Sequence, residues 1–140
     1  MANEDAFQKI KTDLIARNES TYGKEVRKRF GDKAMDDSNR KLAGLTEEQW
    51  QRQQQLAEQI LAELKILTPQ NEPASPRAQA LCDLHRQWLQ VFWADGSYSS
   101  QAHLALAEGY LADQRFAAYY DQAAPGATQF LRDALSIYCS

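Results

Sequence analysis

The stretch "HRQWLQVFWADGSYSSQAH" begins at His85 and ends at His103, the only two histidines of the 140-residue chain. Two tryptophans, a phenylalanine and a tyrosine lie between them. Histidine titrates near neutral pH and is a common metal ligand, whereas aromatic rings offer flat apolar faces to a ligand. The stretch could therefore hold a metal, carry out catalysis, line a binding site, or simply pack in a core.

The spacing of these residues argues against metal and catalytic chemistry. Two distant histidines, accompanied only by Cys82 and Cys139, match no metal-ligand pattern. Cys82 and His85 are close enough to touch on a helix, but no third group orients the imidazole as nucleophilic catalysis requires. The sequence also contains no carboxylate pair, glycine-rich phosphate loop or P-loop. We therefore expect no metal, no cofactor and no enzymatic activity.

Helical spacing gathers the aromatic and histidine side chains on two faces. Intervals of three and four place one group on a single helix face: Leu81, Leu84, His85, Trp88 and Phe92. A second helix carries His103, Leu106 and Tyr110 in the same way, and the turn between the helices would bring the two faces together. Such a face is core more often than pocket, but a buried polar group without a partner costs about 1–3 kcal/mol. The residues alone therefore support either a plain core or a partly polar pocket.

The bulk composition fits one compact domain in a reducing compartment. A chain of 140 residues, 44% of them hydrophobic, can bury a single core. Its net charge of -3 and isoelectric point near 5.4 are unlike those of a dedicated nucleic-acid binder. Neither a signal peptide nor an apolar run of about 18 residues is visible, and two cysteines make no disulfide framework. We expect a cytoplasmic protein with no membrane contact and no direct nucleic-acid contact.

Composition and apolar spacing predict an all-α fold of about seven helices. The first helix starts near Phe7, continues toward Phe30 and ends at Gly31. Asp32 would then cap a short second helix to about Leu42.

The third helix has the clearest start signal. The segment "LTEEQW" contains a capping box at Thr46, and the helix should run to about Leu67. The prolines of "TPQNEPASP" predict a loop. Ser75 followed by Pro76 restarts a helix that should extend to about Trp93.

Three shorter helices complete the prediction. Ser97 or Ser99 would cap a helix that ends near Ala112. Asp113 would cap the helix "QRFAAYYD", and Pro125 would occupy the first turn of a terminal helix.

The N-terminal third differs in charge and apolar content from the rest. Up to Lys41 the chain has ten Lys and Arg against eight Asp and Glu, and its apolar residues are widely spaced. The remainder has six against eleven and holds most of the aromatics. Such a segment buries little area against the entropy of ordering it. We expect a single domain, 1–140, in which a mobile lid of residues 1–45 covers a helical core of residues 46–140.

Four stretches resemble the TipAS antibiotic-recognition domain family: "YGKEVRKRFGDKAMDDSNRKLAGLTEEQW", "HRQWL", "LAEGYLADQRFAAYYD" and "APGATQFLRDAL". The likeness covers nearly the whole chain, in order and with similar spacing. TipAS domains form the ligand-binding C-terminal part of MerR-type drug-responsive regulators and also occur as free proteins. The resemblance implies a globin-like helical fold without haem that binds large, hydrophobic, aromatic-rich antibiotics, thiopeptide-like or albicidin-like.

The same resemblance implies a set of residues around the family's ligand cleft: Trp50, His85, Trp88, Leu89, Phe92, Trp93, Tyr98, His103, Tyr110, Phe116, Tyr119 and Tyr120. Within this set we expect Trp88 to be mainly structural and Trp93, beside the turn, to contact ligand. The thiopeptide-binding prototype of the family has a cysteine in the turn before the second histidine that can attach covalently to ligand. Here that turn reads Ala94, Asp95, Gly96 and Ser97, which favours reversible binding.

Two roles follow from the resemblance. The protein would sequester a drug as a free-standing resistance protein, or it would be the effector domain of a MerR-type transcriptional regulator with an upstream DNA-binding domain. The residues alone leave a different class open, a helical protein-interaction module in which the aromatic cluster is plain core. Ligand-induced quenching of tryptophan fluorescence distinguishes the two classes.

Overall fold

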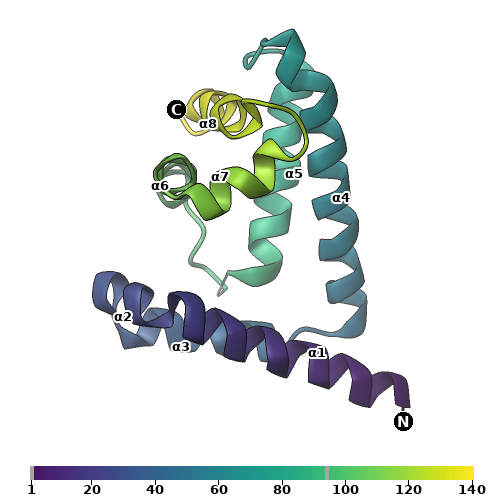
Figure 1. The fold of residues 1–140 in the computed structure, drawn as a ribbon, viewed down its shortest axis with the longest axis vertical. Helices are drawn as coiled ribbons and strands as arrows, with labels where there is room; N and C mark the ends of the chain where they lie inside the picture. The colour runs from purple at the N-terminus through teal and green to yellow at the C-terminus, as the bar shows by residue number, and fades with distance from the viewer. Residues whose placement is uncertain (1, 94) are drawn as a thin grey trace.

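In the computed structural model, which describes residues 2–93 and 95–140, every regular element is helical. In chain order the elements are α1 (Ala2–Asn18), the π-helical η1 (Glu19–Gly23), α2 (Lys24–Phe30), α3 (Asp32–Ala43), α4 (Glu47–Gln70), α5 (Pro76–Phe92), α6 (Ser100–Ala112), α7 (Gln114–Asp121) and α8 (Ala127–Tyr138) (Figure 1). Because α1, η1 and α2 follow one another without interruption, the described residues form seven helical units. The predicted all-α fold is confirmed.

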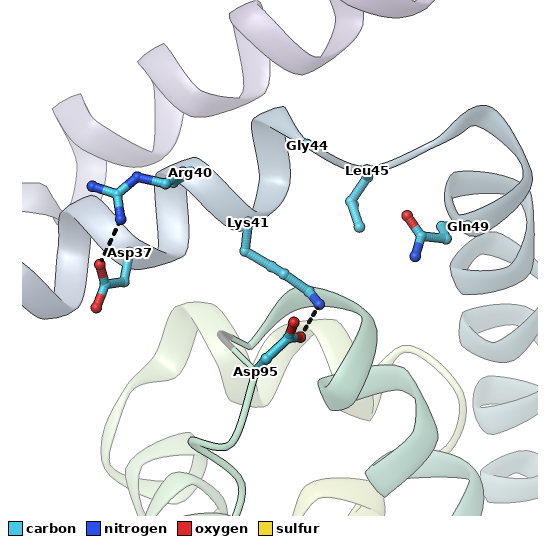
Figure 2. Close-up of a pocket in the computed structure, with 7 residues that line it drawn as sticks. All are labelled: Asp37, Arg40, Lys41, Gly44, Leu45, Gln49 and Asp95. Atoms are coloured by element: carbon cyan, nitrogen blue, oxygen red, sulfur yellow. Dashed lines mark hydrogen bonds and ion pairs between the residues drawn. The ribbon is translucent and has the colours of Figure 1, made fainter.

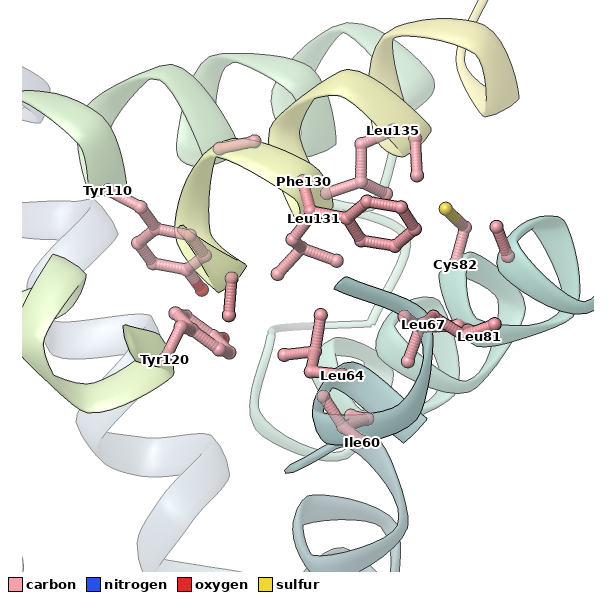
Figure 3. Packing of buried hydrophobic residues seen from close by; sticks show 14 residues of the cluster. Ile60, Leu64, Leu67, Leu81, Cys82, Tyr110, Tyr120, Phe130, Leu131 and Leu135 are labelled. Carbon is pink, nitrogen blue, oxygen red and sulfur yellow. The ribbon is translucent and has the colours of Figure 1, made fainter. Parts of the chain in front are cut away.

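The core lies among the five helices from α4 to α8. Helices α4 and α5 run side by side in opposite directions, and α8 packs against both (Figure 1). Helices α6 and α7 each contact α8 as well. Figure 3 shows Leu64 of α4, Leu81 of α5 and Leu131 of α8 in the buried cluster, where Tyr110 and Tyr120 also lie. Each fully buried leucine contributes about 1.5–3 kcal/mol. These helices therefore have a hydrophobic core of their own.

Four predicted helix starts are confirmed. Thr46 Oγ1 accepts from the N–H of Gln49 at 3.1 Å, and Gln49 Oε1 accepts from the N–H of Thr46 at 2.9 Å, which completes the capping box. The side chains of Ser75, Ser99 and Asp113 cap α5, α6 and α7, each by accepting from a backbone N–H of the first turn. The local sequence therefore determines where these helices begin.

The end of α4 differs from the prediction. The helix continues past Leu67 to Gln70 and includes Pro69. Proline in a last turn removes a single backbone hydrogen bond, so the helix can absorb it there. Asn71 ends the helix in the left-handed conformation, with φ 54°, and its N–H bonds to the carbonyl of Leu67 at 3.2 Å.

Two predicted caps are also wrong. Gly31, with φ 91°, occupies the N-cap position of α3, and the carboxylate of Asp32 binds Arg27 instead. The terminal helix begins after Gly126, with φ 84°, so Pro125 lies before its first turn. In both places a glycine adopts a backbone conformation that the predicted residue avoids.

Helices α1 to α3, together with η1, form an N-terminal arm that lies across one end of the α4–α5 pair (Figure 1). The guanidinium of Arg27 holds the arm together, because it pairs with Glu19 of η1 and with Asp32 and Asp36 of α3. Lys11 of α1 adds a buried contact, donating from Nζ to the carbonyls at the end of α3. The arm is thus a folded helical layer that owes much of its cohesion to charged contacts.

Several side-chain contacts join the arm to the core. The rings of Phe7 and Trp50 lie 6.2 Å apart between α1 and α4. The rings of Tyr22 and Phe116 stack at 5.4 Å between η1 and α7. An ion pair of 2.5 Å joins Lys41 of α3 to Asp95 in the turn between α5 and α6. Ala94, the first residue of that turn in the sequence prediction, lies outside the described residues.

Candidate ligand-binding groove

The two histidines are fully buried, each with 0% exposure. His85 Nδ1 and His103 Nε2 are 2.8 Å apart, and the second nitrogen of each ring bonds to a phenol. His85 Nε2 lies 2.9 Å from the hydroxyl of Tyr120, and His103 Nδ1 lies 2.8 Å from that of Tyr98. The polar groups expected to need partners therefore satisfy one another across α5, α6 and α7.

Burial keeps both imidazoles neutral. It lowers the pKa of His85 to about 3, and the neighbouring His103 adds to the shift. Burial also lowers the pKa of His103 to about 4, and the positive charge of Arg86 adds to that shift. Burial raises the pKa of the Cys82 thiol to about 12. Neither a charged imidazole nor a reactive thiolate is therefore present in this part of the core at neutral pH.

Aromatic rings form a continuous series from one side of the molecule to the other. Successive ring centroids lie 4.9–5.9 Å apart in the order Tyr22, Phe116, Tyr110, Tyr120, His85, His103, Tyr98 and Trp93. The middle of this series is buried core, whereas Trp93 and Phe116 near its ends are only partly buried. The aromatic cluster therefore serves as core at its centre and as exposed lining at its ends.

Both ends of this series reach a groove between the arm and α6. The larger compartment of the groove, about 670 Å³, is bounded by α2, α3, α6 and the turn after α5: Phe30, Lys33, Ala34, Asp37, Ser38, Trp93, Ser97, Ala102, Ala105 and Leu106 line it. The smaller, about 420 Å³, is bounded by η1, α2, α6 and α7: Tyr22, Glu25, Val26, Arg29, Phe30, Leu106, Gly109, Tyr110, Ala112, Asp113, Arg115 and Phe116 line it. Phe30 and Leu106 belong to both, so the compartments are neighbouring parts of one groove. Each volume is in the range of ordinary ligand pockets.

Charged side chains surround the smaller compartment. The guanidinium of Arg115 lies 4.6 Å from the centre of the Tyr22 ring. It also pairs with Asp113 at 2.6 Å and with Glu25 at 3.7 Å. An apolar floor with a charged rim favours a ligand that is largely hydrophobic and makes a few polar contacts at its edges.

A polar pocket of about 390 Å³ lies beside the larger compartment and shares Asp37 with it. Figure 2 shows Lys41 reaching from α3 to Asp95, and Arg40 paired with Asp37 along the same helix. Gln49 Oε1, on the α4 side, is used by the capping box. The charged groups of this pocket already pair with one another, and it offers little apolar surface for a large hydrophobic ligand.

The structure separates the twelve expected site residues into three groups. Three of them line the groove: Trp93, Tyr110 and Phe116. Tyr98 lines an adjoining pocket that shares Trp93 with the larger compartment. The other eight lie elsewhere: Trp50, His85, Trp88, Leu89, Phe92, His103, Tyr119 and Tyr120 line neither compartment.

Most of these eight residues pack within the protein. His85, Leu89, His103 and Tyr120 are buried: each is at most 3% exposed. Trp50 packs on Phe7, and the rings of Trp88 and Phe92 meet at 5.2 Å on α5. Tyr119 is 40% exposed on α7. Contact between these residues and a ligand remains a prediction.

Sequence reasoning missed several residues of the groove. Phe30, Val26 and Lys33 lie in the segment expected to act as a lid. Leu106 lies on a helix face for which the sequence leaves core and pocket both open, and no sequence pattern singles out Gly109. Phe30 ends α2 immediately before Gly31 and is 69% exposed, which only the structure reveals.

Other kinds of site gain no support from the described residues. Over 2–93 and 95–140, no group of three or more His, Cys, Asp or Glu side chains is placed to hold a metal ion. In that same part of the chain, no helix has both the length and the hydropathy needed to cross a membrane.

A helical core with an aromatic groove beneath a helical arm defines a small-molecule recognition domain. The chain belongs to the TipAS antibiotic-recognition domain family, which matches residues 22–138. A solved structure of TipAS from Streptomyces lividans, in complex with the thiopeptide antibiotic nosiheptide, is 33% identical and superposes with a TM-score of 0.71. The superposition covers 86% of this chain and 85% of that one. The resemblance inferred from the sequence is confirmed.

Longer relatives place such a domain in transcriptional activators. The HTH-type transcriptional activators TipA of Streptomyces coelicolor and Streptomyces lividans are each 36% identical over 116 residues, which cover 81% of this chain and 45% of the activator. The HTH-type transcriptional activator mta of Bacillus subtilis is 24% identical over 143 residues, which cover 99% of this chain and 53% of the activator. The chain thus spans about half the length of these relatives.

Proposed function

We propose that the protein binds a large, hydrophobic antibiotic with aromatic rings in the groove between the arm and α6, reversibly and without catalysing a reaction. The observation that supports this best is the groove itself, with partly buried rings from Tyr22, Trp93 and Phe116 around it. A concave, largely apolar groove of this size with a few polar groups is typical of small-molecule sites. The family relationship and the nosiheptide complex of the solved relative support the same ligand class.

Reversible capture is supported by the state of the two cysteines. Cys82 is fully buried and its thiol has a pKa of about 12, so it is a poor nucleophile. Burial also raises the pKa of Cys139. After incubation with nosiheptide, intact-mass measurement should find the protein at its unmodified mass.

The role of the domain depends on what accompanies it. Because the relatives are about twice as long and are HTH-type activators, we infer that this domain acts as the effector part of a transcriptional regulator, or sequesters the drug on its own. In the first case the arm would pass the effect of ligand binding to an upstream DNA-binding domain. We also propose that residues 1–45 act as a lid over the ligand. The ion pairs of Arg27, which hold the arm together as one layer, support this role.

Titration with nosiheptide tests the proposal. Binding should quench tryptophan fluorescence through Trp93 and raise the melting temperature, since a ligand at 100 times its dissociation constant adds about 2.7 kcal/mol of stability. The Trp93→Phe variant provides the control, because it should bind while losing most of the quenching. Nosiheptide that changes neither fluorescence nor melting temperature would contradict the proposed function.

A further inference from the structure

Helix α6, which ends at Ala112, carries an exposed glycine in its last turn, at position 109, where the groove passes. Gly109 lines the smaller compartment, and a Cβ built on it meets no heavy atom within 4 Å. Its φ is not positive, so the backbone conformation does not require glycine either. Neither packing within the protein nor backbone geometry explains why this position lacks a side chain.

Glycine weakens a helix at such a position. It is among the least favourable residues in a helix interior, because it has the largest backbone entropy to lose. The carbonyl of Gly109 accepts from the N–H of Asp113 at 3.1 Å, so the main chain presents no unpaired acceptor here. What remains is a bare backbone surface beside the rings of Tyr110 and Phe116, whose centroids are 5.4 Å apart.

We propose that Gly109 determines the specificity of the groove by leaving room for a flat, unsaturated ring of the ligand to lie directly on the α6 backbone. This inference rests on the proposed function and narrows the ligand class. The ring occupies the smaller compartment, and the rest of the ligand passes Phe30 and Leu106 into the larger one. The ligand is therefore an elongated molecule with at least two ring-bearing parts.

Two substitutions at this position test the inference with nosiheptide as the probe. Gly109→Ala should raise the melting temperature of the free protein by about 2–4 °C, because alanine favours the helix, and should weaken nosiheptide binding. Gly109→Phe should fill the compartment and raise the dissociation constant about tenfold or more. Gln101→Phe is the matched control, since Gln101 is exposed on the same helix and lines neither compartment.

For Gly109→Ala, the melting temperature should rise while the affinity for nosiheptide falls, so misfolding cannot produce the expected result. A variant that is more stable alone and binds less tightly cannot owe its weaker binding to a damaged fold. If the wild type binds nosiheptide and both Gly109 variants bind it with the same affinity, the inference is wrong but the proposed function stands. A fall in melting temperature for Gly109→Ala would also overturn it, and a wild type that fails to bind nosiheptide would overturn both.

Discussion

At the scale of single residues, two tryptophans near the end of α5 have different roles, one in the core and one in the groove. Trp88 contacts His85 and Phe92 and donates from Nε1 to Gln53 at 3.3 Å, whereas Trp93 lines the groove. Trp88→Ala should cost about 3 kcal/mol of unfolding free energy. Trp93→Ala should cost well under half of that and weaken nosiheptide binding. Urea unfolding and fluorescence titration measure the two effects, and equal losses of stability would contradict the assignment.

The buried histidines predict how stability depends on pH. Their pKa values in the folded protein, about 3 and about 4, lie below the value of about 6.5 expected in the unfolded chain, so the unfolded state binds more protons below pH 6.5. Their contribution to the unfolding free energy is therefore complete above pH 7 and is lost as the pH falls from 6.5 toward 3. At pH 5 the two together should lower the unfolding free energy by about 4 kcal/mol.

Urea unfolding between pH 8 and pH 5 measures this loss. The carboxyl groups with lowered pKa values, such as Glu63, titrate below this window and do not obscure it. His103→Gln should show about half the pH dependence of the wild type. An unfolding free energy that stays constant from pH 8 to pH 5 would show that the histidines are not neutral in the folded protein.

The inward position of His85 could be predicted from the sequence, but its partners could not. Helical spacing places His85 on the same face as Leu81, and the structure buries it. The phenol of Tyr120 lies 35 residues after His85 and reaches it only because α7 folds back toward α5, and no local pattern encodes that packing. The Tyr98 phenol, by contrast, lies only five residues before its partner His103. Gly109 was overlooked for a similar reason, since its use depends on the arm that lies opposite.

At the scale of helices, Gly31 sets the angle between α2 and α3. Its φ of 91° and ψ of 162° belong to a region that is essentially restricted to glycine. Gly31→Ala should therefore cost about 1–3 kcal/mol, and this cost should fall on the arm. Hydrogen exchange should accelerate in residues 2–45 and stay unchanged in α5. Gly44→Ala is the matched control, because Gly44 has φ -86° and tolerates a side chain.

Some helix boundaries are determined by the local sequence, and others by packing against distant parts of the chain. The capping box at Thr46 involves residues three apart, so the sequence alone predicts it. Pro69 was read as part of a loop, but α4 packs along the core far enough to continue through it. The glycines at 31 and 126 displaced the expected caps because the chain must turn sharply there to place α3 and α8. Tertiary packing decides such cases, and a single sequence does not reveal it.

At the scale of the whole molecule, the arm should be less stable than the core it covers. Its contacts with the core include two ring pairs and two ion pairs at the surface, and exposed ion pairs contribute little. Amide hydrogen exchange of the free protein should therefore be much faster in residues 2–45 than in residues 81–93. Nosiheptide should slow exchange in the arm. Equal protection of both regions before ligand is added would mean that the arm is not a lid.

The bonds that join Tyr98, His103, His85 and Tyr120 have a further consequence for the whole molecule. A neutral imidazole has one N–H and one lone pair, so both rings must carry their proton on the same kind of nitrogen, either Nδ1 or Nε2. Nitrogen-15 shifts should therefore report identical tautomers for the two rings in every ligand state. The positions of the protons in these four hydrogen-bonded side chains are therefore coupled to one another. Whether Tyr98 offers a proton or a lone pair beside the groove is therefore tied to the direction of a hydroxyl on α7, on the far side of the core.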